Sequence, residues 1–275
     1  GEARVQALLT GQIDMNRYVQ FSQKKIFDGN SKFKTSVIPT GNWRGMVMNT
    51  ERAPFDNPKV RKAVRLAVDR QELVDTVMGG EAVVSCDTPV APTDQYRHNM
   101  GCKQNIAEAK KLLKEAGYPN GIEMVIHVST KEPTWPTIAE VIQQQVAKAG
   151  IKVDIKMTPS KSYWKETWMK KDVAMTRWNE RSADSVLHEV YHSSAKWNES
   201  YYKSSDFDKN LADARGELDF TKRKALYVKA QHTLWNQSGT MIPYHVSKLV
   251  VTNSRVKNLD EVEVFSIQWH KVKVD

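Results

Sequence analysis

One segment of the sequence has residue types and spacing that could hold a metal ion. It reads His188-Glu189-Val190-Tyr191-His192 and matches the H-E-x-x-H pattern of zinc metallohydrolases. On a helix, residues four positions apart share a face, so both imidazoles could bind Zn²⁺ while the glutamate acts as general base. A third ligand is needed, and neither Glu199 nor Glu217 stands in a distinctive context. Since three fixed positions also match by chance, the alternative is a surface helix with two ordinary histidines.

A second candidate site is the loop that follows a strand predicted over residues 173–176. Ligands of open α/β sheets collect beyond the carboxyl ends of strands. Trp178 opens this loop, and the planar guanidinium of Arg181 suits a carboxylate. Two acidic residues of the loop could receive a cationic amine, although an ordinary salt-bridged turn and helix cap would look similar. The candidate ligand-binding residues are Trp178, Arg181, Glu180, Asp184, Trp43 and Arg177.

The tryptophans are a further signal, because the chain of 275 residues contains eight of them. Aromatic rings beside a few fixed polar groups commonly line ligand clefts. Trp43, Trp135 and Trp197 lie near predicted strand ends or in loops, as Trp178 does. The alternative for each ring is a place in a hydrophobic core, where most tryptophans pack.

The two cysteines, Cys86 and Cys102, flank a loop rich in Pro, Asp, Asn and Gly. An even number of cysteines close in sequence predicts a loop-closing disulfide, and such bonds persist in oxidising compartments. Two unpaired buried thiols are the alternative. A zinc pair is disfavoured, because the spacing is far from C-x₂₋₄-C.

The composition excludes several classes of protein. With 40% hydrophobic and 27% charged residues, the chain is not disordered, and its apolar stretches are too short to cross a bilayer. The 41 basic and 32 acidic residues give a net charge of +9, but the lysines are scattered. No nucleic-acid-binding motif accompanies them, which indicates a solvated basic surface and no nucleic-acid partner. The sequence also lacks a Walker loop, G-x-S-x-G and G-x-G-x-x-G.

Alternating helices and strands must position these residues, which predicts an α/β layered domain. Asn105 can cap a helix that ends at Gly117, and residues 151–157 alternate strictly between apolar and polar. The tail beyond residue 241 is rich in strands and is expected to join a different sheet. Predicted helices cover 2–10, 20–27, 58–68, 71–78, 106–116, 138–149, 160–170, 182–191, 207–216 and 220–235. Predicted strands cover 13–15, 34–38, 45–48, 122–128, 151–157, 173–176, 242–245, 249–251 and 262–267.

Several motifs resemble one family in the order in which that family carries them. Residues 48–70, from Met48-Asn49-Thr50 through Pro54-Phe55-Asp56 and Val60-Arg61 to Asp69-Arg70, resemble a signature of the family 5 extracellular solute-binding proteins. These proteins are the periplasmic receptors of peptide, nickel and opine ABC transporters. Further similar segments are Ala7-Leu8 with Gly11, Ile13 and Asp14; Ala109-Lys110 with Leu112-Leu113 and Glu115-Ala116-Gly117-Tyr118-Pro119; Gly150-Ile151-Lys152-Val153; and Glu217-Leu218-Asp219 with Lys222-Arg223 and Leu226-Tyr227.

The resemblance implies a periplasmic binding protein-like α/β fold of type II (cluster C) with two lobes. Family members are considerably longer, so the chain is expected to be a C-terminal portion in which only the second lobe is complete. Residues 1–48 would end lobe one and form a hinge, 49–239 would form the second lobe, and 240–275 would return to lobe one. A signal peptide would then lie in the missing N-terminal part.

The implied function is that of a non-enzymatic, monomeric, exported binding protein of the periplasm. It would need no cofactor, would close around a short peptide or a peptide-like or opine-like anion, and would deliver it to membrane permease subunits. Closure would use hinges near residues 40–49 and 239–243.

The resemblance also bears on the two candidate sites. Trp178 matches a tryptophan of the ligand-binding wall, but Arg181 stands where peptide receptors commonly have an aspartate for the ligand's α-amino group. An anionic ligand group facing Arg181 is therefore expected, unless Glu180 or Asp184 replaces the aspartate. The family has no catalytic metal, so the H-E-x-x-H match becomes a coincidence. A metal-chelate or haem receptor using His188 and His192, and least of all a zinc metallohydrolase, remain as alternatives.

Overall fold

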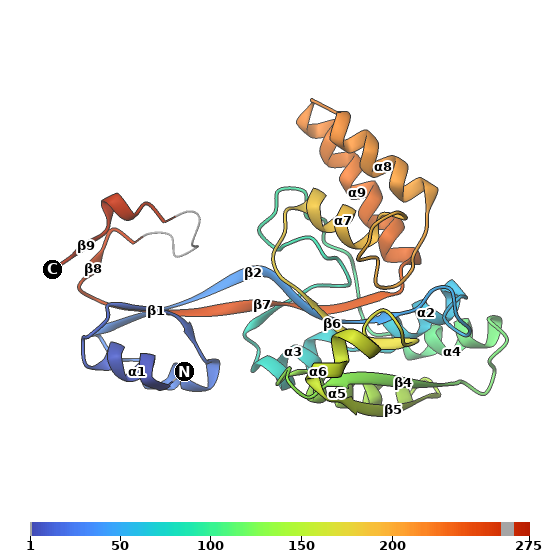
Figure 1. Cartoon of the computed structure of the whole chain (residues 1–275), viewed down its shortest axis with the longest axis horizontal. Coiled ribbons are helices and arrows are strands. Elements are labelled where there is room, and N and C mark those ends of the chain that lie inside the picture. Colours follow the sequence, from blue (N-terminus) through green and yellow to red (C-terminus); the bar gives the residue numbers. More distant parts are fainter. Residues whose placement is uncertain (1, 260–266) are drawn as a thin grey trace. The chain divides into compact units, whose positions relative to one another are not determined.

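The computed structural model describes residues 2–259 and 267–275, and the chain forms two compact units (Figure 1). The smaller unit combines residues 1–40 with 246–275, and the larger unit comprises 41–245. Strands β2 (Phe33–Met48) and β7 (Thr240–Asn253) each contribute residues to both units. The assignment of lobes with boundaries at residues 48 and 239 stays a prediction.

The smaller unit is built around helix α1 (Glu2–Leu9) and strand β1 (Met15–Val19). Strand β1 pairs antiparallel with the end of β7. Val5 and Leu8 of α1 pack in one buried cluster with Leu249 of β7. The helix predicted at the start of the chain is confirmed, and the adjacent strand begins two residues later than predicted.

The remaining elements of the smaller unit are short. The helix predicted over 20–27 is a 3₁₀ helix, η1 (Phe21–Ile26). Strands β8 (Val256–Lys257) and β9 (Lys273–Val274) pair antiparallel, and η3 (Trp269–Lys271) precedes β9. The strand predicted over 262–267 lies, except for its last residue, outside the described residues.

The larger unit contains a sheet with the strand order β7-β2-β6-β4-β5. Strand β3 (Ala82–Val84) also pairs with β7 but stands outside this strand order. Strands β4 (Ile122–Ser129) and β5 (Ile151–Thr158) are parallel, and β6 (Val173–Trp178) pairs parallel with β4 and antiparallel with β2. The carboxyl ends of β4, β5 and β6 therefore lie at the same edge, from which the candidate loop departs.

The two longest strands differ from the prediction. The sequence predicts two separate short strands within β2 and two within β7, whereas each is continuous. Proline and glycine at positions 39 and 41 are residue types that commonly end strands, so the sequence wrongly indicates a break between two strands here. A close contact between strands explains a further glycine, since a Cβ atom on Gly45 would lie 2.4 Å from the Met241 carbonyl oxygen. Pairing with strands distant in sequence, which local patterns do not contain, extends both elements.

The parallel pair β4–β5 has one buried and one exposed face. Ile151 and Val153 are buried while Lys152 and Asp154 are exposed, which confirms the predicted alternation in the first part of the strand. Met157, which the alternation places on the buried face, is 47% exposed. Helix α5 (Trp135–Ala147) contacts both strands and covers the buried face. The helix predicted to end before Gly150 is thereby confirmed.

Side-chain caps fix the start of three helices. Helix α2 (Pro58–Leu66) has proline at its first position and Asn57 accepting a hydrogen bond from the Lys59 N–H. Asp69 caps α3 (Arg70–Met78), and Asn105 caps α4 (Ile106–Glu115). These caps are local sequence signals, which is why the three helices are predictable.

The segment after β5 departs from the single helix predicted over 160–170. It consists of one turn, α6 (Ser160–Ser162), followed by a π-helical turn, η2 (Tyr163–Thr167). The Tyr163 hydroxyl is buried and donates to the carbonyl oxygen of Met175 (2.5 Å). The wider turn brings the rings of Tyr163 and Trp164 against Trp135.

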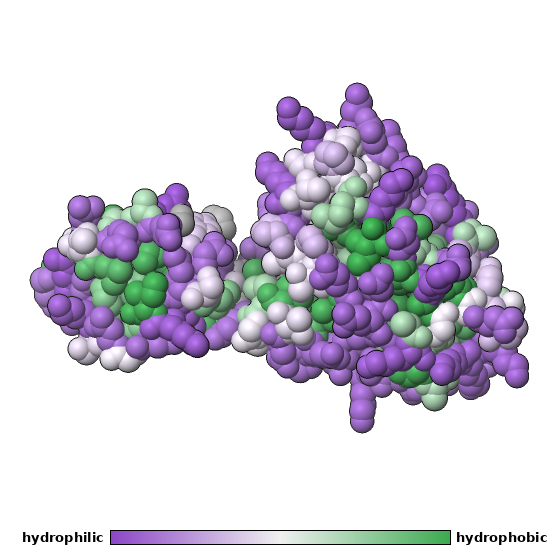
Figure 2. All heavy atoms as spheres, turned by 90° about the horizontal axis from the view of Figure 1, so that it is seen from below, coloured by the Kyte–Doolittle hydropathy of each residue, from purple (hydrophilic) through white to green (hydrophobic). Residues whose placement is uncertain are grey.

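A second core lies between the last helices of the larger unit, α7 (Ala183–Tyr191), α8 (Ser205–Gly216) and α9 (Phe220–Gln237), drawn in yellow and orange in Figure 1. All three helices agree with the prediction. On the face shown in Figure 2, hydrophobic residues of the larger unit form patches among hydrophilic residues. Within the described part of the chain, no helix is both long and apolar enough to span a bilayer.

The predicted disulfide between Cys86 and Cys102 is present, with their Cα atoms 5.1 Å apart. The alternative of two unpaired thiols is therefore wrong. The bridge ties down a loop that also contains Asp87, which forms a buried ion pair with Arg70 (2.6 Å). Closing a loop of this size contributes about 3 kcal/mol to the free energy of unfolding.

Candidate functional site

The end of β6 and the facing part of β2 form the framework of the candidate site. The antiparallel register places Trp43 opposite Trp178 and Arg44 opposite Arg177. Directly opposed residues of an antiparallel pair point to the same face of the sheet. The two tryptophans therefore share one face, and the two arginines share the other.

The tryptophan face is mostly core. Trp43 is completely buried, and Trp178 is half-buried and packs against the cluster formed by α7, α8 and α9. The ring of Trp178 also contacts that of Trp197, with centroids 5.8 Å apart. Trp197 is 41% exposed, so this ring offers the accessible aromatic surface next to Trp178.

Glu180 holds the loop against β2. Its Oε2 atom accepts a hydrogen bond from the Gly41 N–H (2.9 Å), and its own N–H donates to Asn42 Oδ1 (2.9 Å). A Cβ atom on Gly41 would lie 2.6 Å from the Glu180 Cγ atom, so only glycine permits this approach. The carboxylate of Glu180 thus already has a structural partner.

Asp184 is engaged more strongly. Arg215 donates to both of its carboxylate oxygens (2.7 and 2.8 Å), and the Tyr227 hydroxyl donates to Oδ1 (3.1 Å). Burial alone would raise the pKa of Asp184, but the hydrogen bonds and charge of Arg215 outweigh burial and lower it. A ligand amine would have to compete with this bidentate pair.

Arg181 is the loosely held charge of the loop. Its Nη1 donates to the Glu180 carbonyl oxygen (3.0 Å), and its Nε lies 3.4 Å from Glu189 Oε2. The side chain remains 37% exposed. An exposed pair of this length contributes little to stability, so the guanidinium is free to exchange its partner for an anion.

Arg177 lies on the opposite face of the sheet. Its Nε donates to Glu132 (2.8 Å), and its guanidinium lies 5.8 Å from the centre of the Trp164 ring. The sequence identifies Arg177 as a candidate but misses Arg44, Glu132 and Trp164. These residues come from three distant segments. The pairing of β2 with β6 places Arg44 opposite Arg177, and Glu132 and Trp164 contact Arg177 only in the folded chain.

His188 and Glu189 of the H-E-x-x-H segment lie on helix α7, but the helix ends at Tyr191, and His192 is its C-cap residue with a ψ of 139°. The centroids of the two histidine rings are 4.7 Å apart. Glu189, however, accepts from Ser185 Oγ (2.6 Å) and faces Arg181, while His192 Nδ1 is 2.9 Å from Ser194 Oγ. Burial lowers the pKa of His188. Across residues 2–259 and 267–275, no group of three or more His, Cys, Asp or Glu side chains is arranged to hold a metal ion.

The two glutamates considered as a third zinc ligand lie elsewhere. Glu199 accepts from Thr176 Oγ1 (2.7 Å) in the interior, and Glu217 accepts from the Asp219 N–H (2.8 Å). The segment therefore brings two histidine rings close together, but His192 lies beyond the end of the helix, and no third zinc ligand accompanies them among the described residues.

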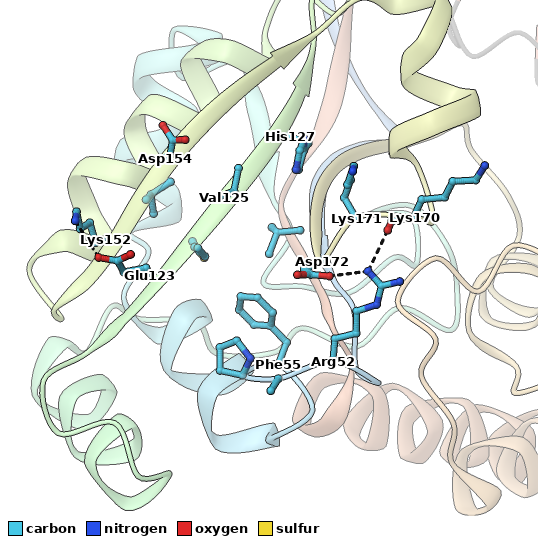
Figure 3. Close-up of a pocket in the computed structure, with 15 residues that line it drawn as sticks. Arg52, Phe55, Glu123, Val125, His127, Lys152, Asp154, Lys170, Lys171 and Asp172 are labelled. Carbon is cyan, nitrogen blue, oxygen red and sulfur yellow. Dashed lines mark hydrogen bonds and ion pairs between the residues drawn. The ribbon is translucent and has the colours of Figure 1, made fainter.

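A cavity of about 760 Å³ lies over the exposed face of β4 and β5 (Figure 3). Phe55 and Val125 supply apolar lining, and the ion pairs Arg52–Asp172 (2.8 Å) and Lys152–Glu123 (2.9 Å) neutralise much of the charged lining. The residues that line this cavity do not include the candidate ligand-binding residues predicted from the sequence.

A family model described as "Bacterial extracellular solute-binding proteins, family 5 Middle" matches residues 1–198. The chain belongs to this family. The match covers well over half of the chain and includes most of the motifs that resemble the family. The family predicted from those motifs is thus confirmed.

Individual relatives agree. The glutathione-binding protein GsiB of Pectobacterium atrosepticum is 28% identical over 265 residues, and GsiB of Escherichia coli (strain K12) is 30% identical over 266. Each match covers 92% of this chain and 51% of the relative. The periplasmic binding protein DppA from Helicobacter pylori, solved with the peptide STSA, has a TM-score of 0.75 at 27% identity, and the match covers 93% of this chain and 51% of that one.

These likenesses confirm the predicted α/β fold of periplasmic binding proteins. The chain spans about half the length of the relatives that it matches. The placement of the lobes and the roles of the candidate residues remain predictions for this family member.

Proposed function

We propose that the protein is the substrate-binding component of an ABC importer, and that it binds short peptides or peptide-like or opine-like anions. The observation that carries the proposal is membership of the family 5 solute-binding proteins over residues 1–198. In this role the protein binds its ligand in the periplasm without converting it and presents it to membrane permease subunits.

The chemistry of the candidate site supports this ligand class. Trp197 offers an exposed ring, and Arg181 offers a loosely paired guanidinium at the carboxyl end of β6. An exposed aromatic ring suits the apolar part of a small ligand, and a planar cation suits its carboxylate. The glutathione and peptide named for the relatives are ligands of this chemical kind.

Native mass spectrometry of the natural full-length protein, purified without denaturation, tests the proposal. We expect a retained small molecule with the mass of a short peptide or a related carboxylate. Retention of one equivalent of zinc alone, together with peptidase activity, would instead favour a metallohydrolase using His188 and His192.

Replacement of Arg181 by Gln is expected to weaken binding of the retained ligand about tenfold, because one charge-assisted hydrogen bond to an anion is lost. Isothermal titration calorimetry on the full-length protein measures the change. Arg255→Gln is the matched control, since Arg255 is an exposed arginine of the smaller unit that is paired with Asp14. Equal affinities of the Arg181 variant and the wild type would remove Arg181 from the binding site.

A further inference from the structure

A single buried carboxyl group holds two tryptophans of the larger unit. Glu199, in the segment between α7 and α8, is almost completely buried. Its Oε1 atom accepts hydrogen bonds from the Trp168 indole and from Thr176 Oγ1 (2.7 Å), and the Trp178 side chain contributes a further one. The three donors come from the segment after η2 and from two positions of β6. One side chain therefore joins the segment after η2 to the end of β6.

The number of donors explains why the acceptor is a carboxyl group. Burying such a group is unfavourable, and burial raises the pKa of Glu199 to about 7 although its hydrogen bonds lower it. A carboxylate has two oxygens that only accept, whereas Gln has one oxygen and an amide group that only donates. The ionised Glu199 therefore directs acceptors alone towards the three donors. A protonated Glu199, or a Gln in its place, also presents a donor to them.

The donor that matters for the ligand is Trp178. This residue ends β6 and opens the candidate loop, and Thr176 lies two positions before it, so both side chains point to the same face of the strand. Glu199 binds both and thereby fixes the end of the strand from that face. Glu180 holds the next part of the loop against Gly41. Together the two glutamates determine the course of the loop at its start.

Trp178 in turn supports an exposed ring. The centroid of its ring lies 5.8 Å from that of Trp197, which is 41% exposed. Trp197 also precedes Glu199 by two residues, so this exposed ring is connected to Glu199 both along the chain and through Trp178. A shift of the Trp178 indole would change the surface on which Trp197 rests. The orientation of the aromatic surface at the candidate site therefore depends on the buried carboxyl group.

Two phenols also face Glu199, those of Tyr163 on η2 and Tyr191 on α7. Burial raises the pKa of each phenol, and the charge of Glu199 acts in the same direction, so both phenols stay neutral near neutral pH. The three hydrogen-bond donors do not titrate in this range. The protonation state of Glu199 itself therefore decides how firmly the two indoles are held.

We propose that Glu199 is a positioning residue of the ligand-binding site, and that its ionised carboxylate orients Trp178 and so presents the Trp197 ring to the apolar part of the ligand. Glu199 lies behind these rings and does not touch the ligand. The inference rests on the proposed function and deepens it, because it makes the affinity for the ligand depend on pH. Binding favours the ionised form, so affinity rises as the pH increases through about 7.

Native mass spectrometry of the full-length protein, with a pool of di-, tri- and tetrapeptides below saturation, tests this assignment at two pH values. At about pH 8 we expect the wild type to capture about tenfold more peptide than Glu199→Gln, because the variant lacks the charged acceptor. At about pH 5.5 the wild type is protonated at Glu199, so the two proteins should capture equal amounts. Each comparison is made at one pH, so the ionisation of the peptides themselves cancels.

A double-mutant cycle determines whether Glu199 acts through Trp178. Trp178→Phe keeps a ring without the N–H donor, and adding Glu199→Gln to it should change capture by less than about twofold. The matched control is Glu140→Gln, because Glu140 is exposed, and it should behave as the wild type does at both pH values. Circular dichroism verifies that each variant is folded.

Equal capture by the wild type and Glu199→Gln at the higher pH overturns the positioning role while leaving the proposed function intact. So does a loss by the same factor at both pH values, which would reflect general damage to the fold, or a full loss that persists in the Trp178→Phe background. Capture of no peptide by the wild type at either pH would contradict peptide binding itself, and the positioning role would fall with it.

Discussion

The His245→Gln variant is expected to gain stability relative to the wild type as the pH falls. Between pH 7 and pH 4, the difference between their free energies of unfolding should change in favour of the variant by about 3 kcal/mol. His245 lies on β7, is completely buried, and has its Nε2 atom 3.5 Å from the carbonyl oxygen of Pro89. Burial, together with the charge of Arg97, lowers its pKa from the ordinary 6.5 to about 3.

The sign follows from where each state takes up a proton. The unfolded chain protonates His245 below pH 6.5, whereas the folded protein does so only near pH 3. Acidification through this window therefore favours the unfolded wild type by about 1.4 kcal/mol per pH unit. Gln cannot take up a proton, and its amide nitrogen can still donate towards Pro89, so the variant avoids this loss.

Urea unfolding at a series of pH values measures the difference between the two proteins. His270→Gln is the control, because His270 is exposed, and it should show no comparable change. A difference between His245→Gln and the wild type that stays constant from pH 7 to pH 4 would show that the native state accommodates a charged His245.

Glu199→Gln is expected to change stability in the opposite pH direction. Glu199 is 4% exposed, and its Oε1 atom accepts hydrogen bonds from the Trp168 indole and from Thr176 Oγ1 (2.7 Å). The Trp178 side chain contributes a further hydrogen bond to this carboxylate. Burial raises its pKa from the ordinary 4.5 to about 7, although these hydrogen bonds lower it.

The folded protein thus keeps a proton on Glu199 up to about pH 7, while the unfolded chain releases it near pH 4.5. Raising the pH from 5 to 8 should lower the free energy of unfolding of the wild type by about 3 kcal/mol, and the Gln variant should not show this loss. The same urea experiment reads this out, with the exposed Glu140→Gln as control. If the Glu199 variant and the wild type respond to pH in parallel, Glu199 is ionised in the folded protein at neutral pH.

The two effects oppose each other between about pH 4.5 and 6.5, where the windows overlap. In the wild type, the two opposite slopes of the free energy of unfolding against pH nearly cancel in this range. A measurement of wild-type stability against pH would therefore show neither group. Each single variant is expected to uncover the slope of the group that remains. In the double variant, these two positions should make no pH-dependent contribution to the free energy of unfolding.

Much of the secondary structure is predictable because its signals are local. The caps at Asn57, Asp69 and Asn105 fix three helix starts, and strict alternation in residues 151–157 indicates a strand that is half-buried in its first part. The failures lie where distant partners intervene. Pairing between strands makes β2 and β7 continuous, and packing of aromatic rings on Trp135 turns the segment after β5 into a π-helical turn.

The position of the candidate site is predictable from the sequence, but the partners of its individual side chains are not. Its position after β6 follows from the local pattern of strand and loop. The structure then shows Glu180 bound to Gly41 and Asp184 bound to Arg215, while Trp43 is buried. Contacts between residues more than thirty positions apart leave no trace in the spacing of the sequence, so Arg181 emerges as the available charge only in the folded chain.

The sequence by itself determined the family, the alternation of helices and strands, and the disulfide. These features depend on motifs, periodicity and neighbours within the same loop. Only the tertiary structure decided which charges are already neutralised and which polar groups are buried. The register of β2 against β6 brings Arg44 to Arg177, and packing places Glu199 in the interior. Burial and pairing are properties of the whole fold, because each depends on side chains that approach from distant segments.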